Sequence, residues 1–165
     1  MEWRGIEIHP DTPPEGLPIE RMFRPEDTKR MMQNLRAMGA PFGIIFSDIT
    51  RISNSRLALQ AAEFSRDQGR FDAFHDALLQ AYFAAGLDIG DFPVIAQLGR
   101  DVGLDIPALE KALGMGTYLP KLKQMQEEAA QAGVTGVPTF LLGARRTIVG
   151  AQPLEVFRNT LRSLG

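Results

Sequence analysis

The sequence of 165 residues contains no cysteine. Thiol–disulfide exchange needs a thiolate that attacks a sulfur atom, and no other side chain can replace sulfur in that reaction. These residues can therefore form no disulfide bond and supply no redox-active thiol. The compartment stays open on this evidence, because a chain without cysteine is compatible with any redox environment.

Clusters of positive charge and long apolar runs are missing as well. The 18 Lys and Arg residues are scattered among 20 Asp and Glu residues, and the formal net charge is −2. A nucleic-acid-binding surface needs clustered Lys and Arg, so we expect no nucleic-acid partner. No stretch approaches the roughly 20 apolar residues of a membrane-spanning helix, and the start Met1-Glu2-Trp3-Arg4 is unlike a signal peptide. We therefore expect no membrane partner and a cytoplasmic location.

The sequence does have enough apolar residues to build a core. Hydrophobic residues make up 44% of the chain and include 7 Met and 10 Phe. A chain of this length buries roughly 70% of the surface that its unfolded form exposes. We expect one domain with a sizeable insertion, which needs neither a disulfide nor a bound metal or cofactor.

The most informative segment runs from Gly133 to Leu142 and reads as a loop that leads into a buried strand. Phe140, Leu141 and Leu142 do not alternate with polar residues, which favours a strand covered on both faces. A second apolar run, Thr147–Val149, follows a turn over Gly143–Arg146. The pair predicts a β-hairpin, and a helix that opens with Pro153 follows it.

Near the N-terminus, Trp3–Ile8 is the only good early strand, with Ile6 and Ile8 on one face. The stretch Pro10–Pro18 contains four prolines, which favour a stiff, extended loop.

Helical signals dominate from Pro25 to Ala132. Residues that favour helix starts precede apolar residues three or four apart, and glycines end or separate the helices. Pro25, Asn54, Asp91 and Asp105 mark starts, Phe71 begins the apolar pattern of a further helix, and Leu122 extends the last pattern. The glycines are Gly39, Gly69, Gly86, Gly103 and Gly133. The layout is therefore a strand, a long helical block, a hairpin and a final helix.

Several stretches in this order resemble the DsbA family of thioredoxin-fold disulfide oxidoreductases, and most of all its FrnE-like branch. They are Asn54-Ser55-Arg56-Leu57-Ala58, Phe74-His75-Asp76-Ala77-Leu78, Gly86-Leu87-Asp88-Ile89-Gly90-Asp91, Gly136-Val137-Pro138-Thr139-Phe140 and Val149-Gly150-Ala151-Gln152-Pro153. The resemblance implies an α/β, DsbA-like fold. Residues 1–24 and 133–165 would form an incomplete thioredoxin-like domain, and residues 25–132 a large all-helical insertion domain.

The sequence departs from the family at its catalytic element. The family carries a C-x-x-C motif at the start of a helix that follows the first central strand. This sequence begins after that point, so we expect the strand, the motif and the helix to be missing. We accordingly assign no catalytic residue and expect the polypeptide to be inactive by itself.

The resemblance implies a substrate-binding site in the loop before the hairpin. In thioredoxin folds the proline at the position of Pro138 is cis, and the residue before it, here Val137, offers its backbone N–H and C=O to an extended peptide. Thr135, Gly136 and Thr139 would flank this groove. Gly136 would allow an unusual backbone dihedral angle or a close approach of the peptide. We expect an extended peptide or protein as the substrate.

Other candidate residues favour structural roles. His75 lies between Phe74 and Leu78 on a helix, so packing is expected rather than general-base catalysis. Asp88 and Asp91 lack a third ligand for a metal, and Asp91 is better interpreted as a helix cap. Two larger sets are weaker candidates: serines 47, 53, 55, 65 and 163 as nucleophiles, and methionines 22, 31, 32, 38, 115 and 125 as a peptide-binding surface. For the methionines, core packing is the favoured interpretation.

Three functions remain open at this stage. The favoured one is a thiol–disulfide oxidoreductase of the DsbA family that lacks its redox cysteines here. The second is a glutathione-dependent enzyme similar to 2-hydroxychromene-2-carboxylate isomerases and kappa-class transferases, in which an upstream serine would activate glutathione. The third is a non-catalytic, chaperone-like peptide-binding module. Because the missing strand would leave unpaired backbone groups, a homodimer that completes the sheet is a further hypothesis.

Overall fold

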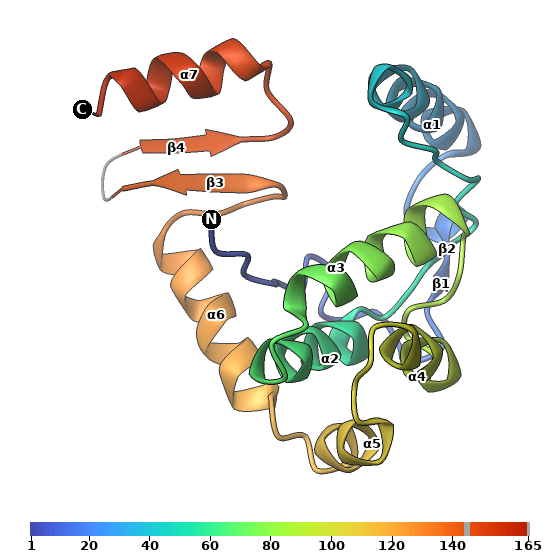
Figure 1. The fold of residues 1–165 in the computed structure, drawn as a ribbon. Helices are drawn as coiled ribbons and strands as arrows, with labels where there is room; N and C mark the ends of the chain where they lie inside the picture. The colour runs from blue at the N-terminus through green and yellow to red at the C-terminus, as the bar shows by residue number, and fades with distance from the viewer. Residues whose placement is uncertain (144–145, 165) are drawn as a thin grey trace. The chain divides into compact units, whose positions relative to one another are not determined.

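The computed structural model describes residues 1–143 and 146–164 (Figure 1). The chain divides into two units, Met1–Leu122 and Lys123–Gly165, and the boundary falls inside helix α6 (Leu119–Gln131). The predicted division into residues 1–24 with 133–165 and residues 25–132 stays a prediction.

The first unit is built mainly from helices, and their positions follow the signals in the sequence. They are α1 (Pro25–Gly39), α2 (Arg56–Asp67), α3 (Phe71–Leu79), the π-helical turn η3 (Gln80–Ala84), α4 (Phe92–Asp101), α5 (Ile106–Gly114) and the first turn of α6. The short 3-10 helices η1 (Ile19–Arg21) and η2 (Ala40–Phe42) flank α1, and strands β1 (Leu17–Pro18) and β2 (Arg51–Ile52) pair antiparallel.

The predicted helix caps are confirmed in part. The Asp105 carboxylate accepts a hydrogen bond from the Ala108 N–H at 3.0 Å, as an N-cap side chain should. Asn54 accepts from the Arg56 N–H at 3.0 Å, one residue before the N-cap position of α2. Asp91 occupies the N-cap position of α4, but its side chain makes no capping bond, so the expected role of its carboxylate is wrong.

The core of the first unit lies where α2, α3, α4 and α5 pack together. Phe74, Ile95 and Leu109 are fully buried at its centre. Helix α2 contributes Ala58 and Ala61, whose small side chains let neighbouring helices approach closely.

Residues 1–8 do not form the predicted strand, because this segment packs against helices instead of pairing with a sheet. The Trp3 ring lies 4.8 Å from that of His75, and His75 stacks on Phe71 at 5.4 Å. The Arg66 guanidinium lies over the Phe71 ring, with its central carbon 3.7 Å from the ring centroid. The same guanidinium donates a hydrogen bond to the Trp3 C=O at 2.8 Å. The expected packing role of His75 is therefore confirmed.

Two further contacts hold this segment to α2. Arg56 donates two hydrogen bonds to the Glu7 carboxylate, at 2.8 and 3.1 Å, and a third to the Pro10 C=O. Gly5 lies so close to Leu59 that a Cβ atom there would be 2.5 Å from the leucine Cδ2. The apolar residues of Trp3–Ile8 therefore belong to a segment that packs on helices, not to a strand in a sheet.

Acidic side chains of α2 also hold the start of α6. The buried Glu63 carboxylate meets Lys121 Nζ at 2.5 Å and Arg66 Nε at 3.2 Å. One turn further on, Asp67 accepts a hydrogen bond from the Tyr118 hydroxyl at 2.6 Å. Burial, the hydrogen bond to Asp67 and the negative charge of that carboxylate raise the pKa of Tyr118 to about 12.

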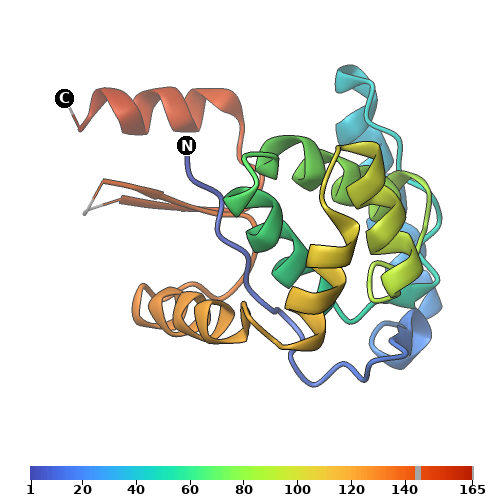
Figure 2. The same ribbon diagram turned by 60° about the horizontal axis from the view of Figure 1, so that its bottom comes forward.

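The second unit contains a hairpin and a helix. Strands β3 (Thr139–Leu142) and β4 (Arg146–Val149) pair antiparallel, with Thr139 opposite Val149 and Phe140 opposite Ile148. Figure 2 shows the hairpin edge-on, with α7 (Leu154–Arg162) on one side and α6 on the other. The predicted hairpin and final helix are confirmed, although Arg146 belongs to the strand, and positions 144 and 145 of the expected turn lie outside the described residues.

The coverage of β3 differs from its prediction. Phe140 packs edge-on against Phe157 of α7, with ring centroids 4.8 Å apart, and Ile148 beside it is buried. On the opposite face, however, the Leu141 side chain is 54% exposed. The prediction that β3 is buried on both faces is therefore correct only for the face that packs against α7.

We expect the substitution Arg56→Gln to loosen the N-terminal segment, because it removes the paired bonds to Glu7. Trp3 is the only tryptophan, so its emission should shift to the red and become more accessible to acrylamide. The free energy of unfolding should fall by about 1 kcal/mol, as for a partly exposed ion pair. Arg158→Gln, which removes a surface pair with Glu155, is the matched control and should leave Trp3 unchanged. Equal emission in all three proteins would contradict the docking of this segment.

Tyr118 should make stability depend on pH in the alkaline range. The folded protein holds the phenol proton more strongly than the unfolded chain, whose tyrosine has the ordinary pKa of 10. The extra stability is complete below about pH 10 and is lost as the pH rises through about 12. The difference in unfolding free energy between wild type and Tyr118→Phe should change across this range. A constant difference, measured by denaturant titration, would show that the raised pKa is wrong.

Candidate functional site

The loop between α6 and β3 begins with a helix end that turns the chain. Gly133 has a φ of 70°, which glycine adopts without steric cost, and its N–H donates to the Ala130 C=O. The Val134 N–H donates to the Ala129 C=O at 2.9 Å. These bonds close α6 and release the chain at Thr135.

The end of the loop is fixed to the hairpin. The Val137–Pro138 peptide bond is cis, as predicted. The Pro138 C=O accepts a hydrogen bond from the Gly150 N–H at 2.8 Å, and the Thr139 hydroxyl donates to the Gly136 C=O at 2.6 Å. One hydrogen bond therefore holds the end of the loop to Gly150, directly after β4, and the other joins two residues within the segment.

The bond between Gly150 and Pro138 sets which backbone groups of β3 point outward. In an antiparallel pair, the N–H and C=O of alternate residues point toward the partner strand. Because the Pro138 C=O points toward β4, the groups of Phe140 and Leu142 also point there. The N–H and C=O of Thr139 and Leu141 consequently point to the open edge of β3, and across the hairpin those of Thr147 and Val149 point to the open edge of β4.

Val137 is an exposed residue of the predicted site. Its side chain is 59% exposed, and no hydrogen bond from residues 1–143 or 146–164 reaches its N–H or C=O. Thr135 and Gly136 precede it in the same loop, and Pro138 and Thr139 follow. The five predicted residues are adjacent in the sequence, and within this loop the N–H and C=O of Val137 form no hydrogen bond with the described residues.

Gly136 differs from its prediction in one respect. Its φ is not in the left-handed region, so no unusual dihedral angle requires glycine here. A Cβ atom added at this position would meet nothing within 4 Å. Of the two reasons given for glycine, only the close approach of a peptide still stands as a prediction.

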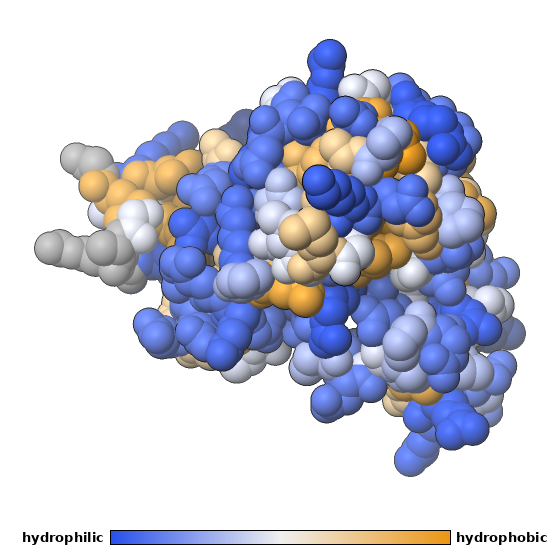
Figure 3. Space-filling view, turned by 90° about the horizontal axis from the view of Figure 1, so that it is seen from below, coloured by the Kyte–Doolittle hydropathy of each residue, from blue (hydrophilic) through white to orange (hydrophobic). Residues whose placement is uncertain are grey.

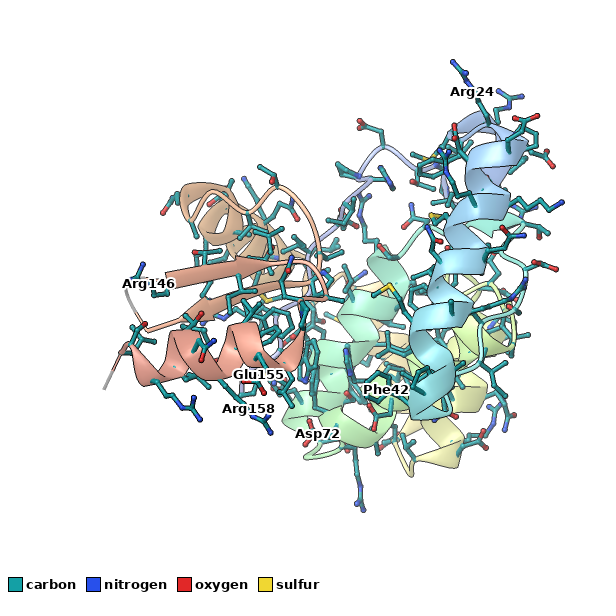
Figure 4. All side chains as sticks on the ribbon, turned by 90° about the horizontal axis from the view of Figure 1, so that it is seen from above. Arg24, Phe42, Asp72, Arg146, Glu155 and Arg158 are labelled. Carbon is teal, nitrogen blue, oxygen red and sulfur yellow. The ribbon has the colours of Figure 1, made fainter. Side chains whose placement is uncertain are left out.

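The electrostatic character of the site is neutral. From Gly133 through Gly143 the sequence contains no charged residue. Outside the loop, Arg146 starts β4, whereas Glu155 and Arg158 form an ion pair at 2.6 Å on α7 (Figure 4). An extended partner on the β3 edge would therefore meet backbone groups and apolar or hydroxyl side chains rather than charges.

The other candidates from the sequence form structural hydrogen bonds with the backbone. Asp88 accepts a hydrogen bond from the Gly90 N–H at 2.9 Å, which closes a turn. The hydroxyls of Ser47, Ser65 and Ser163 donate to backbone carbonyls. Among the described residues, no group of three or more His, Cys, Asp or Glu side chains is placed to hold a metal ion. Over the same residues, no helix is long and apolar enough to cross a membrane.

The methionines are divided between core and surface. Met32 and Met125 are buried, as expected, whereas Met38 and Met115 are exposed. Met32 also lines an open cleft of about 440 Å³ beside α1, together with Ile19, Ile49, Lys29 and Arg36. Arg36 donates a hydrogen bond to the Asp48 carboxylate at 2.7 Å, so its positive charge is partly neutralised within the protein.

Comparison with known proteins places the chain in a family. The model of the DsbA-like thioredoxin domain matches residues 1–162, so this chain belongs to that family. Its fold is accordingly a DsbA-like thioredoxin fold. The FrnE-like branch stays a prediction, because the match does not separate the branches of the family.

Two relatives span nearly the whole chain. A probable DsbA oxidoreductase from Streptomyces coelicolor, known from its crystal structure, is 26% identical and superposes with a TM-score of 0.85. The superposition covers 96% of this chain and 72% of that one. The uncharacterized protein YwbO from Bacillus subtilis (strain 168) is 26% identical over 164 residues, which are 98% of this chain and 80% of YwbO.

Leu141 is the residue of the site that sequence reasoning missed. The sequence predicts a strand covered on both faces, whereas the Leu141 backbone groups point to the open edge of β3 and the residue is 54% exposed. The signal was available in part: Leu141 is two positions after Thr139, so the two residues must share an orientation in any strand.

We expect Gly136→Ala to leave the protein as stable as wild type or up to about 1 kcal/mol more stable. The position is open and has no positive φ, and replacing glycine there reduces the entropy of the unfolded chain. Gly114→Ala is the matched control, because Gly114 is also open and also lacks a positive φ. A large loss of stability in Gly136→Ala alone would show that the described loop conformation is wrong.

Proposed function

We propose that this chain binds an extended stretch of polypeptide at residues 135–139 and serves as the substrate-binding part of a DsbA-like protein. The observation that carries the proposal is the unpaired backbone N–H and C=O of the exposed Val137, next to Pro138. A peptide strand could complete hydrogen bonds there and continue along the outward groups of Thr139 and Leu141.

The neutral character of this segment suggests the class of substrate. Backbone hydrogen bonds do not depend on sequence, so selectivity would come from side chains beside the edge. Those of Val137, Thr139 and Leu141 are apolar or carry a hydroxyl. We therefore expect a preference for uncharged, partly apolar segments, which an unfolded protein exposes more than a folded one.

The redox step is separate from this binding. The similar Streptomyces protein is described as a probable DsbA oxidoreductase, which supports oxidoreductase chemistry for a protein of this family. These 165 residues contain no thiol, so any disulfide exchange would need a cysteine from outside them. The glutathione-dependent alternative and the cytoplasmic location stay predictions.

A direct test measures the binding of a fluorescent, uncharged peptide of alternating Thr and Val by fluorescence anisotropy. Gly136→Leu should weaken binding at least roughly tenfold, because a bulky side chain would stand beside the backbone of Val137. Gly114→Leu makes the same change at an open position outside the loop and should bind as wild type does.

A second arm tests whether the backbone is recognised. Two versions of the same peptide carry backbone N-methyl groups on either the odd or the even residues. An N-methylated residue cannot donate a backbone hydrogen bond, so the version that blocks the donors facing the site should bind more weakly. The cysteine-free chain should not reduce insulin disulfides in parallel assays. Equal binding by wild type and Gly136→Leu, or by both methylated peptides and the parent, would refute the proposed site.

A further inference from the structure

The first unit contains an open cleft of about 440 Å³ that the proposed peptide site does not include. Helix α1, the 3-10 helix η1 and residues 48–50 before β2 form its walls. All of these residues belong to Met1–Leu122, so the cleft lies within one unit. Sites for small molecules in proteins usually measure roughly 300–1,000 Å³, so the size of this cleft suits a small ligand.

Hydrogen bonds hold the walls of the cleft in place. The Ile19 N–H donates to the Thr50 C=O at 3.0 Å, which joins η1 to the segment before β2. Arg36 of α1 donates to the Phe46 C=O at 2.9 Å and to the Asp48 carboxylate at 2.7 Å. Both helices are thus tied to the same segment, and the fold itself sets the shape of the cleft.

Apolar side chains form the floor of the cleft. Ile19 and Met32 line it although these residues are only 4% and 3% exposed. Ile49, which is half-buried, and the Pro25 ring complete the apolar lining. A ligand with an apolar body would therefore remove apolar surface from water here, which favours binding.

Two of the four charged side chains in the lining have no partner. Arg36 and Asp48 form an ion pair with each other. The side chains of Glu20 and Lys29 form no hydrogen bond or ion pair with the residues that the structure describes. Gln33 lies one turn after Lys29 on the same face of α1, and its amide has no partner among those residues either. The cleft thus offers one positive charge, one negative charge and an amide to a ligand.

Apolar surface alone does not single out a binding site in this protein. Figure 3 shows separate apolar patches among hydrophilic surface on the face seen from below. Phe42, Ile45 and Met115 are large, exposed apolar residues, and none of the three lines the cleft. The cleft is distinguished by an apolar floor combined with two unpaired charges of opposite sign.

We propose that the cleft binds a small zwitterion with an apolar body, of the class represented by an apolar dipeptide with free ends. The apolar body would lie on Ile19 and Met32. The ligand carboxylate would accept hydrogen bonds from Lys29 and Gln33, and the ligand ammonium would donate to Glu20. A ligand with a single charge fits less well, because an anion would meet the like charge of Glu20 and a cation that of Lys29.

This ligand class differs from the one proposed for residues 135–139. An internal stretch of polypeptide has no free ammonium or carboxylate group at its ends, so its backbone could not pair with both Lys29 and Glu20. The loop, by contrast, carries no charge and suits such a stretch. The two sites should therefore bind different ligands independently.

The test measures the binding of leucyl-leucine to the full chain by isothermal titration calorimetry. N-acetyl-leucyl-leucine lacks the ammonium group and leucyl-leucine amide lacks the carboxylate. Each blocked form should bind at least roughly tenfold more weakly, because it loses a charge-assisted hydrogen bond. Octanoate, which offers an apolar body and a carboxylate alone, should also bind more weakly than leucyl-leucine.

Variants of the two unpaired residues assign each charge. Lys29→Gln should weaken the binding of leucyl-leucine and leave that of leucyl-leucine amide unchanged. Glu20→Gln should weaken the binding of leucyl-leucine and leave that of the N-acetyl form unchanged. Lys111→Gln and Glu110→Gln make the same charge changes on exposed residues of α5, outside the cleft, and should bind as wild type does.

Methyl signals of the methionines in an NMR spectrum give a positional check. The Met32 methyl signal should shift when leucyl-leucine is added, and that of the exposed Met115 should not. Absence of binding at millimolar leucyl-leucine would overturn the proposal, as would equal affinity for the dipeptide and both blocked forms or equal losses in the α5 variants. Gly136→Leu should bind leucyl-leucine as wild type does, so failure of the cleft and failure of the peptide site are distinguishable.

Discussion

The hydrogen bond from the Gly150 N–H to the Pro138 C=O sets which backbone groups of β3 point away from β4. Because it turns the carbonyl of Pro138 toward β4, it fixes the alternation along the whole of β3. Thr139 and Leu141 must then present their backbone groups outward, in continuation of the unpaired Val137. The proposed peptide site therefore depends on the outward groups of this one strand edge.

The first unit holds residues 1–8 against its own helices. An aromatic stack of Trp3, His75 and Phe71, covered by Arg66, holds the segment to α2 and α3. The contacts combine a large apolar area with charge-assisted hydrogen bonds, which are stronger than neutral ones. The apolar residues of Trp3–Ile8, which suggested a strand, are consequently packed against α2 and α3 without joining a sheet.

The helical boundaries could be predicted from local signals because those signals act over a few residues. Pro25 begins α1 and Asp105 caps α5, since a fixed φ and a side-chain acceptor suit a helix start wherever the rest of the chain lies. The cis bond at Pro138 was anticipated from resemblance to a family rather than from the residues alone. By contrast, the fate of Trp3–Ile8 and the exposure of Leu141 depend on which partners are present, and alternation cannot reveal that.

By itself the sequence determined that the chain has no thiol, a nearly neutral charge balance, a helical middle and a hairpin followed by a helix. These properties follow from composition and from interactions between near neighbours. Only the tertiary structure decided that residues 1–8 pack on helices and that Leu141 lies at an open edge. Strand pairing joins residues far apart in the chain, so the direction of each backbone group becomes known only when its partner, here Gly150, is in place.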